Sequence, residues 1–209
     1  MQKEAFFKLT YGLFALFTND GERDNACIIN TACQITDSPK TLSICVNKAN
    51  YSCETLLKSK KFTLSVLSES APFEIFKRFG FASGRDSDKL AGFEAVTASE
   101  NGISRLTAYS NAYFCADVIE TVDMGTHVIF IASVTEAEVI SDEASMTYAY
   151  YFANVKPSTA QSTSAGGEKK IVGWVCKICG YKYEGADIPA DFLCPWCKHP
   201  VEDFEPIYE

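Results

Sequence analysis

Four cysteines near the C-terminus have the spacing of a metal site. They form two CxxC pairs, Cys176 with Cys179 and Cys194 with Cys197, within residues 174–197. Each pair brings two sulfurs onto one tight loop, and two facing loops make a tetrahedral cage of four thiolates that suits zinc or iron. The cage leaves no ligand position open, so zinc there would be structural, whereas iron would carry one electron.

Two disulfides are the alternative for the same four thiols. The chain has nine cysteines, an odd number, and the apolar stretch 9–17 has no signal-type cleavage site after it. This pattern is typical of a reducing compartment, so the sequence predicts a metal site and a cytoplasmic protein. Five other cysteines fall largely in strand patterns, where thiols are often small buried side chains. This is the prediction for Cys27, Cys45 and Cys115, but not for Cys33 and Cys53, which lie in the polar stretches 28–39 and 46–57.

The residues around the CxxC pairs favour iron. Gly180 and Pro195 can shape the two loops, and excluding water is one feature that sets the reduction potential of an iron–thiolate centre. Five aromatic side chains could form that shell: Trp174, Tyr181, Tyr183, Phe192 and Phe204. The stretches WVCKICGYKYEG and DFLCPWC resemble the rubredoxin family, and the short loop 180–193 resembles the rubredoxin-like modules of rubrerythrins. The resemblance implies one iron ion bound by the four cysteines.

A polar segment divides the chain in two. Residues 155–170 are rich in Ser, Thr, Ala and Gly and contain no large apolar residue after Val155. Such a segment cannot offset its ordering entropy, so it is predicted to be a flexible linker. The predicted organisation is a domain over 1–155, a linker over 156–170 and a small metal domain over 171–209.

Residues 1–155 are predicted to be mostly β-strands. Short runs rich in Val, Ile, Thr, Phe and Tyr are separated by turn residues, and NDGERDN (19–25) and VDMGTH (122–127) have the composition of hairpin connections. Two helices are expected, over 52–60 with Ser52 as N-cap and over 71–79 with a stop at Gly80. Many antiparallel strands with few helices predict a mainly β fold with a closed or nearly closed barrel.

Charge and motifs exclude several function classes. The net charge of −8 argues against nucleic acid and anionic membranes as partners. No apolar run approaches the roughly 18 residues of a membrane span. The sequence has no G-x-G-x-x-G motif that opens a helix and no Walker-type loop, so a Rossmann domain is not expected.

Four polar clusters lie at predicted strand ends, over 28–39, 46–57, 80–89 and 124–130. The second leads into the first predicted helix, where Asn, Lys and Ser side chains and free N–H groups could bind phosphate. Together and in this order, with the closing MTYAYYFANVKP, the clusters resemble the flavin reductase-like family and its FMN-binding split barrel. The likeness runs from about Lys8 to Lys156.

The resemblance implies an FMN site built from these clusters. It places Asn30 and Thr31 along the isoalloxazine ring, and Arg85 and Lys89 at the phosphate. It makes His127, in a Gly-x-His turn, the predicted catalytic residue that orients a hydride donor or tunes the ring; a hydrogen-bonded turn histidine is the alternative. The residues implied to border the flavin and its phosphate are Asn47, Lys48, Asn50, Tyr51 and Ser52.

The order of the two domains resembles the high-molecular-weight rubredoxins of anaerobes. The flavin reductase-like resemblance implies a homodimer. The domain order implies that electrons pass from NADH, NADPH or a reductase protein through FMN to the iron centre. The acceptor would be a flavo-diiron protein that reduces oxygen or nitric oxide. Two alternatives remain open at this point: a flavin-binding module with a structural zinc ribbon, and a reductase that releases reduced FMN.

Overall fold

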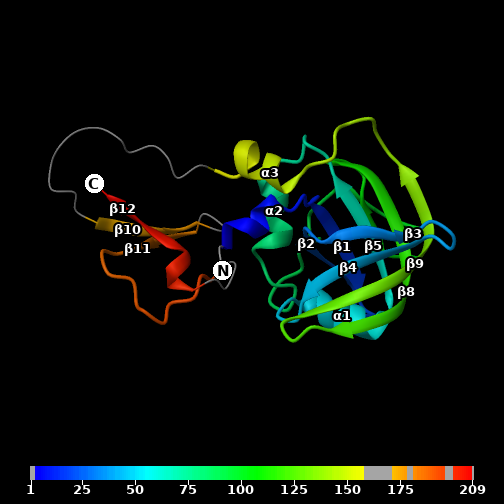
Figure 1. The fold of residues 1–209 in the computed structure, drawn as a ribbon, viewed down its shortest axis with the longest axis horizontal. Coiled ribbons are helices and arrows are strands. Elements are labelled where there is room, and N and C mark those ends of the chain that lie inside the picture. The colour runs from blue at the N-terminus through cyan, green and yellow to red at the C-terminus, as the bar shows by residue number, and fades with distance from the viewer. Residues whose placement is uncertain (1–2, 158–170, 178–180, 196–199, 209) are drawn as a thin grey trace. The chain divides into compact units, whose positions relative to one another are not determined.

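The chain folds into two compact units, Met1–Ala153 and Asn154–Glu209. The computed structural model in Figure 1 describes residues 3–157, 171–177, 181–195 and 200–208. Two of the four predicted metal ligands, Cys179 and Cys197, lie outside the described residues, as does Gly180. The predicted flexible linker over 156–170 lies almost wholly outside them and stays a prediction.

Seven strands of the first unit form one antiparallel sheet that curves into a barrel, in the order β2-β1-β5-β8-β9-β4-β3 (Figure 1). The strands are β1 (Phe14–Asn19), β2 (Asp24–Ile29), β3 (Ala32–Thr36), β4 (Thr41–Asn47), β5 (Lys61–Leu67), β8 (Ser110–Asp123) and β9 (His127–Val139). β2 and β3 are the two end strands of the sheet, and Asn30 and Thr31 alone link them. The seam of the barrel, where its first and last strands meet, therefore lies at this link. The predicted mainly β split barrel is confirmed.

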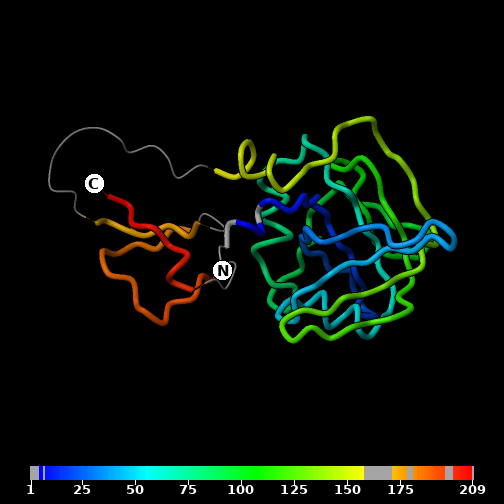
Figure 2. The backbone as a smooth tube through the Cα atoms, viewed as in Figure 1, coloured from blue at the N-terminus to red at the C-terminus, as the bar shows by residue number. Residues whose placement is uncertain are grey.

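Turn chemistry explains both predicted hairpins. Between β1 and β2, Asp20 accepts a hydrogen bond from the Arg23 N–H at 2.9 Å, and Gly21 has a φ of 103°. Between β8 and β9, Asp123 accepts from the Gly125 N–H at 2.8 Å, and Gly125 has a φ of 81°. Glycine adopts such positive φ values without the steric cost of a Cβ. Figure 2 traces the long β8–β9 hairpin in green along the barrel wall.

The helix α1 (Tyr51–Ser59) begins earlier than predicted. Its N-cap is Asn50, so the prediction of Ser52 as N-cap was wrong. Ser52 lies inside the first turn, where its buried Oγ accepts a hydrogen bond from Asn25 Nδ2 at 2.7 Å. The hydroxyl therefore binds β2 instead of capping the helix.

The remaining elements of the first unit are short. The helix α2 (Phe73–Gly80) ends at the predicted glycine and contacts β2. The others are η1 (Lys3–Lys8), β6 (Val96–Ala98), β7 (Ser104–Leu106), α3 (Tyr148–Tyr150) and the π-helical η2 (Tyr151–Val155). Among the described residues, no helix is both long and apolar enough to cross a membrane.

The barrel interior is an apolar core built by strand alternation. In β9, Val128, Phe130 and Ala132 are buried, whereas the residues between them are partly exposed. This period of two is that of a strand with one face in the core. The helix α1 adds Leu56 and Cys53 to the same core, which fixes its position against the barrel.

The second unit is a small three-stranded sheet in the order β11-β10-β12. Its elements are β10 (Ile171–Cys176), β11 (Lys182–Glu184), η3 (Val201–Asp203) and β12 (Phe204–Tyr208). Gly173 allows β10 and β11 to approach, since a Cβ there would lie 2.8 Å from the carbonyl oxygen of Tyr183.

Replacing Phe130 with alanine tests this account of the core. The side chain is fully buried, so Phe130→Ala is expected to lower the free energy of unfolding by about 3–5 kcal/mol. The control is Val139→Ala, because Val139 is 78% exposed at the end of β9 and should change stability by no more than about 0.5 kcal/mol. Urea unfolding followed by far-ultraviolet circular dichroism measures both, and equal losses would contradict the assigned core.

Candidate functional site

The predicted flavin residues gather around the loop that joins β4 to α1. Asn47, the last residue of β4, pairs with His127, the first residue of β9. The link between β2 and β3 also lies against β4. Thr31 O accepts from the Cys45 N–H at 3.1 Å, and Thr31 Oγ1 donates to Cys45 O at 3.0 Å. The structure therefore brings the seam of the barrel and the β8–β9 turn to one loop.

Lys48 fastens this loop to the β8–β9 turn. Its backbone N–H donates to Thr126 O at 3.0 Å, and its Nζ forms an ion pair with Asp123 at 2.6 Å. The hydrogen bond from Lys48 lowers the pKa of the Asp123 carboxyl. Thr126 Oγ1 also lies 2.9 Å from Nδ1 of the half-buried His127. The ammonium group of Lys48 is therefore engaged with a carboxylate, and His127 is held on the anchored turn.

Arg85 reaches the same loop from the segment that follows α2. Its Nη1 donates to Ala49 O at 3.3 Å, and its guanidinium lies 5.3 Å from the centre of the Tyr51 ring. Asn50 caps α1 without a side-chain hydrogen bond to the helix. The free N–H groups of a helix N-terminus carry partial positive charge and favour anions. A cation and a helix N-terminus thus converge, as a phosphate site requires.

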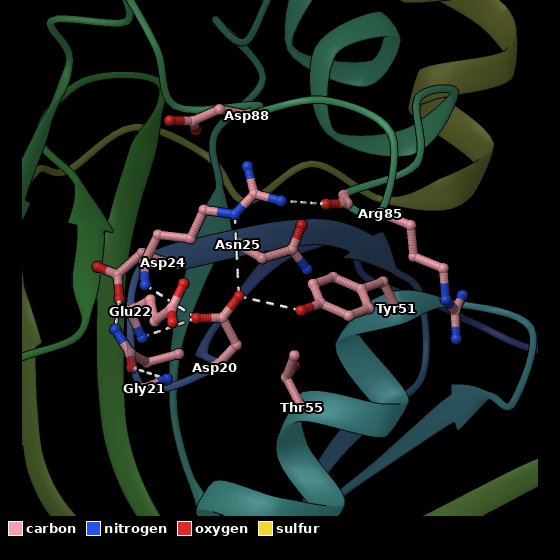
Figure 3. A network of polar contacts seen from close by, with 12 residues as sticks. Asp20, Gly21, Glu22, Asp24, Asn25, Tyr51, Thr55, Arg85 and Asp88 are labelled. Carbon is pink, nitrogen blue, oxygen red and sulfur yellow. Dashed lines mark hydrogen bonds and ion pairs between the residues drawn. The ribbon is translucent and has the colours of Figure 1, made fainter.

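The β1–β2 hairpin holds Arg85 and Tyr51 in position, a role that the sequence did not reveal. Arg23 extends from the hairpin to the segment before Arg85, where its Nη2 donates to Gly84 O at 2.8 Å. The Tyr51 hydroxyl donates to Asp20 at 3.0 Å, and Figure 3 shows this hydroxyl turned toward Asp20. Backbone hydrogen bonds, first from Arg23, lower the pKa of Asp20. The only signal in the sequence was the polar hairpin, which alone predicts a turn.

Gly84 permits the close approach of this segment to the barrel. A Cβ on Gly84 would lie 2.0 Å from Asn25 Oδ1 and 3.0 Å from the Tyr51 ring. A larger residue would therefore displace either this segment or the Asn25 side chain, which is hydrogen-bonded to Ser52.

Two predicted phosphate ligands do not reach this cluster. Lys89 is 7% exposed, and its Nζ donates to Ala26 O at 2.8 Å and to Phe79 O at 3.0 Å. Its ammonium group therefore links β2 to α2, which corrects the prediction that it neutralises the phosphate. The Ser52 hydroxyl is likewise buried against Asn25.

A separate cavity of about 410 Å³ opens at the other end of β4. Thr41 and Leu42 line it, whereas Asn47 lies at the candidate site. The remaining lining residues are Phe14, Ala32, Cys33, Gln34, Lys40, Leu64, Phe114, Val134 and Ala137. Within the described part of the chain, its lining includes none of the predicted flavin residues.

The described half of the predicted metal cage is sheltered from solvent. Cys176 and Cys194 are both fully buried. The Cys176 N–H donates to Tyr181 O at 2.8 Å, so Tyr181 lies beside this predicted ligand. Two thiols excluded from water at the ends of two predicted CxxC loops fit a tetrathiolate metal site.

Aromatic rings pack together in the same unit. The Phe192 ring is the centre of this group, with ring centroids 4.9 Å from Tyr183, 5.6 Å from Phe204 and 6.4 Å from Tyr181. Trp174 donates from Nε1 to Ala186 O at 2.9 Å. The described residues thus form a small aromatic core in a unit too short for a large apolar one.

A split β-barrel followed by a small unit with buried cysteines defines a class: flavin reductase-like proteins with an added rubredoxin-like domain. The chain matches the flavin reductase like domain over residues 6–159 and the rubrerythrin, rubredoxin-like domain over residues 174–205. The chain belongs to the flavin reductase-like family and carries a C-terminal rubredoxin-like domain.

Individual relatives agree with this assignment. A high molecular weight rubredoxin of Moorella thermoacetica is 36% identical over 230 residues, covering 99% of this chain and 100% of the relative. A ferric-chelate reductase (NAD(P)H) of Archaeoglobus fulgidus is 33% identical over 170 residues, covering 81% of this chain and 100% of the relative. An NADH:FAD oxidoreductase of Streptomyces globisporus C-1027 shares the fold, with a TM-score of 0.64 and 19% identity, over 69% of this chain and 85% of that one.

These findings establish a flavin-dependent oxidoreductase fused to a rubredoxin-type electron carrier. Electron transfer through a flavin and a rubredoxin-type iron centre is the general activity of such a combination.

Lys89→Met tests the structural role of the buried lysine. The substitution removes the donor that satisfies two buried carbonyls, so we expect the free energy of unfolding to fall by about 1–3 kcal/mol. Flavin affinity, measured by equilibrium dialysis on protein that remains folded, should not change. A large loss of affinity would restore Lys89 as a flavin ligand.

The pH dependence of stability provides an independent check. Burial lowers the pKa of Lys89 below its ordinary value of 10.5, so the unfolded chain binds this proton more readily than the folded chain. Between the lowered value and 10.5 the wild type should therefore gain stability as pH rises, and Lys89→Met should gain less. Identical pH profiles would contradict the burial of the amine.

Proposed function

We propose that this protein transfers electrons from NAD(P)H or a reductase protein through FMN to an iron ion bound by Cys176, Cys179, Cys194 and Cys197. The final acceptor is a separate redox protein, such as a flavo-diiron reductase of oxygen or nitric oxide. One observation carries the proposal. The chain that places Arg85 at the N-terminus of α1, in a flavin reductase-like barrel, also buries Cys176 and Cys194 in a rubredoxin-like unit.

The cradle at α1 supports FMN as the flavin. Arg85 and the first N–H groups of α1 would bind the terminal phosphate, which riboflavin lacks. Gly84 lets the Arg85 segment approach the helix closely. The ring would lie toward Asn47, with Asn30 and Thr31 along its edge, because this link is hydrogen-bonded to β4.

His127 would act on the ring side of this site. It begins β9 beside Asn47, and its turn is tied to the loop through Lys48. We propose that the imidazole orients a hydride donor or hydrogen-bonds the flavin ring. The name of the archaeal relative, a ferric-chelate reductase (NAD(P)H), supports NADH or NADPH as the donor.

The buried thiols and aromatic packing support iron in the second unit. Solvent exclusion by Phe192 and its neighbouring rings is the environment in which an iron–thiolate centre is tuned. When bound, FMN supplies two-electron and one-electron chemistry, and tetrathiolate iron supplies single-electron transfer. A flavin-binding barrel and an iron unit in one chain therefore suit a carrier that accepts electrons in pairs and passes them on one at a time.

We also propose a homodimer in the cytoplasm, and the β8–β9 hairpin supports the dimer. Val122 and Met124 are 39% and 58% exposed near the His127 turn, and Ile119, further back along β8, is 61% exposed. Covering them with a second copy would bring the subunit contact close to the flavin, as in the family that this chain resembles.

Absorption spectra and rapid mixing test the proposal. Protein expressed anaerobically with iron should contain both FMN and iron–thiolate absorption. In stopped-flow mixing with NADH or NADPH, the flavin should bleach first and the iron band should follow. A protein that holds zinc and no flavin would overturn the proposal. Bleaching by neither nucleotide would assign the donor role to a reductase protein.

Replacing Cys194 with serine separates the two halves of the electron path. Cys194→Ser removes a soft thiolate from the cage, so the iron absorption and iron content should be lost while the flavin remains reducible. The control is Cys33→Ser, because Cys33 is exposed in β3 of the barrel and should keep both chromophores. Elemental analysis and the same stopped-flow traces report the result. Retention of a full iron content in Cys194→Ser would contradict the assigned cage.

A further inference from the structure

Glu54 is itself an anion at the N-terminal end of α1, where the phosphate is proposed to bind. It lies in the first turn of the helix, and its Oε2 forms an ion pair with Arg85 Nη2 at 2.8 Å. Its other oxygen, Oε1, forms an ion pair with Lys58 Nζ at 2.9 Å. The hydrogen bonds from Lys58 and Arg85 lower the pKa of Glu54, so the carboxylate is ionised at neutral pH. The guanidinium assigned to the flavin phosphate is thus already paired with a carboxylate.

Arg85 would keep its position if this pair broke. Its Nη1 is bonded to Ala49 O, its guanidinium lies over the Tyr51 ring, and the carbonyl of the preceding Gly84 is held by Arg23. None of these contacts involves Glu54. The carboxylate is therefore the exchangeable member of the pair, and the guanidinium is the fixed one.

Lys58 provides a partner for the carboxylate after such an exchange. It lies one turn further along α1, a spacing at which Glu and Lys attract each other within a helix. Glu54 would keep this ion pair when Arg85 turns to another anion. Both groups are exposed, with 41% of the Glu54 side chain and 72% of the Lys58 side chain accessible, so solvent also compensates the charge.

We propose that Glu54 is an internal competitor for the phosphate of FMN, which takes its place on Arg85 while Glu54 stays on Lys58. Glu54 thereby limits how much the phosphate contributes to the affinity for the flavin. The inference rests on the proposed FMN site, and it adds a residue that limits affinity rather than one that binds.

Glu54→Gln in the full-length, flavin-depleted protein tests the exchange. The variant removes the negative charge but keeps the size of the side chain, so FMN should bind about two- to five-fold more tightly, the range set by an exposed ion pair. Riboflavin has no phosphate, so its affinity should not change. Lys58→Met leaves Glu54 with Arg85 alone and should weaken FMN binding by about two-fold. Fluorescence titrations with both flavins measure these affinities.

The matched control is Glu74→Gln. Glu74 also lies in the first turn of a helix, α2, and also forms an exposed ion pair, with Lys77 at 3.5 Å. The substitution Glu74→Gln changes the net charge of the protein by the same amount as Glu54→Gln, and it should leave the affinities for FMN and riboflavin as in the wild type. An equal gain in Glu74→Gln would show an effect of net charge and overturn the proposal.

A double-variant cycle with Arg85→Met distinguishes exchange from repulsion across space. If Glu54 acts through Arg85, the gain from Glu54→Gln should vanish in the Arg85→Met background. A gain that persists there, or an unchanged FMN affinity in Glu54→Gln alone, would overturn the exchange while the FMN site stands. A wild-type protein that binds neither flavin would overturn the FMN site and the exchange with it.

Discussion

The pairing of β9 with both β8 and β4 is the constraint on which the barrel and its site depend. Alternate residues of β9, including Val128 and Phe130, fill the barrel core. A slip of one residue would turn this apolar set to solvent, so burial fixes the register. That register places His127 opposite Asn47 and brings the β8–β9 turn to the β4–α1 loop. The site is thus a consequence of core packing, although its own residues are polar.

The distribution of cations explains why one side chain carries the proposed phosphate site. Lys48 is paired with Asp123, and Lys89 is bonded to two backbone carbonyls. Both therefore act as ties between segments, which positions the loop but leaves their charge engaged. Arg85 has a planar group with five donors, so it can be held by Ala49 O and still present donors to an anion. Lys48 and Lys89 hold neighbouring segments together, and Arg85 is the residue proposed to bind the anion.

The second unit solves a different physical problem, because about forty residues cannot bury a large apolar core. Its described residues instead pack a few rings around Phe192 and bury Cys176 and Cys194. A tetrathiolate metal would tie together the two CxxC loops. The burial of the two thiols excludes water from them, and exclusion of water is one of the features that tune a metal–thiolate centre. Close packing in this unit therefore serves both its stability and its proposed electron transfer.

The sequence by itself determined the features that local chemistry controls. Paired CxxC spacing, period-two apolar strands, and the turns at Gly21 and Gly125 each act over a few residues, so the barrel class, the rubredoxin-like unit and both hairpins were predictable. Only the tertiary structure decided which polar residues meet. Lys89 and Ser52 were expected at the phosphate, but both are buried against β2. Asp20, Arg23 and Glu54 gain their roles from segments distant in the chain. Long-range packing decides whether a charge faces a ligand, the core or another side chain, and no local pattern records that choice.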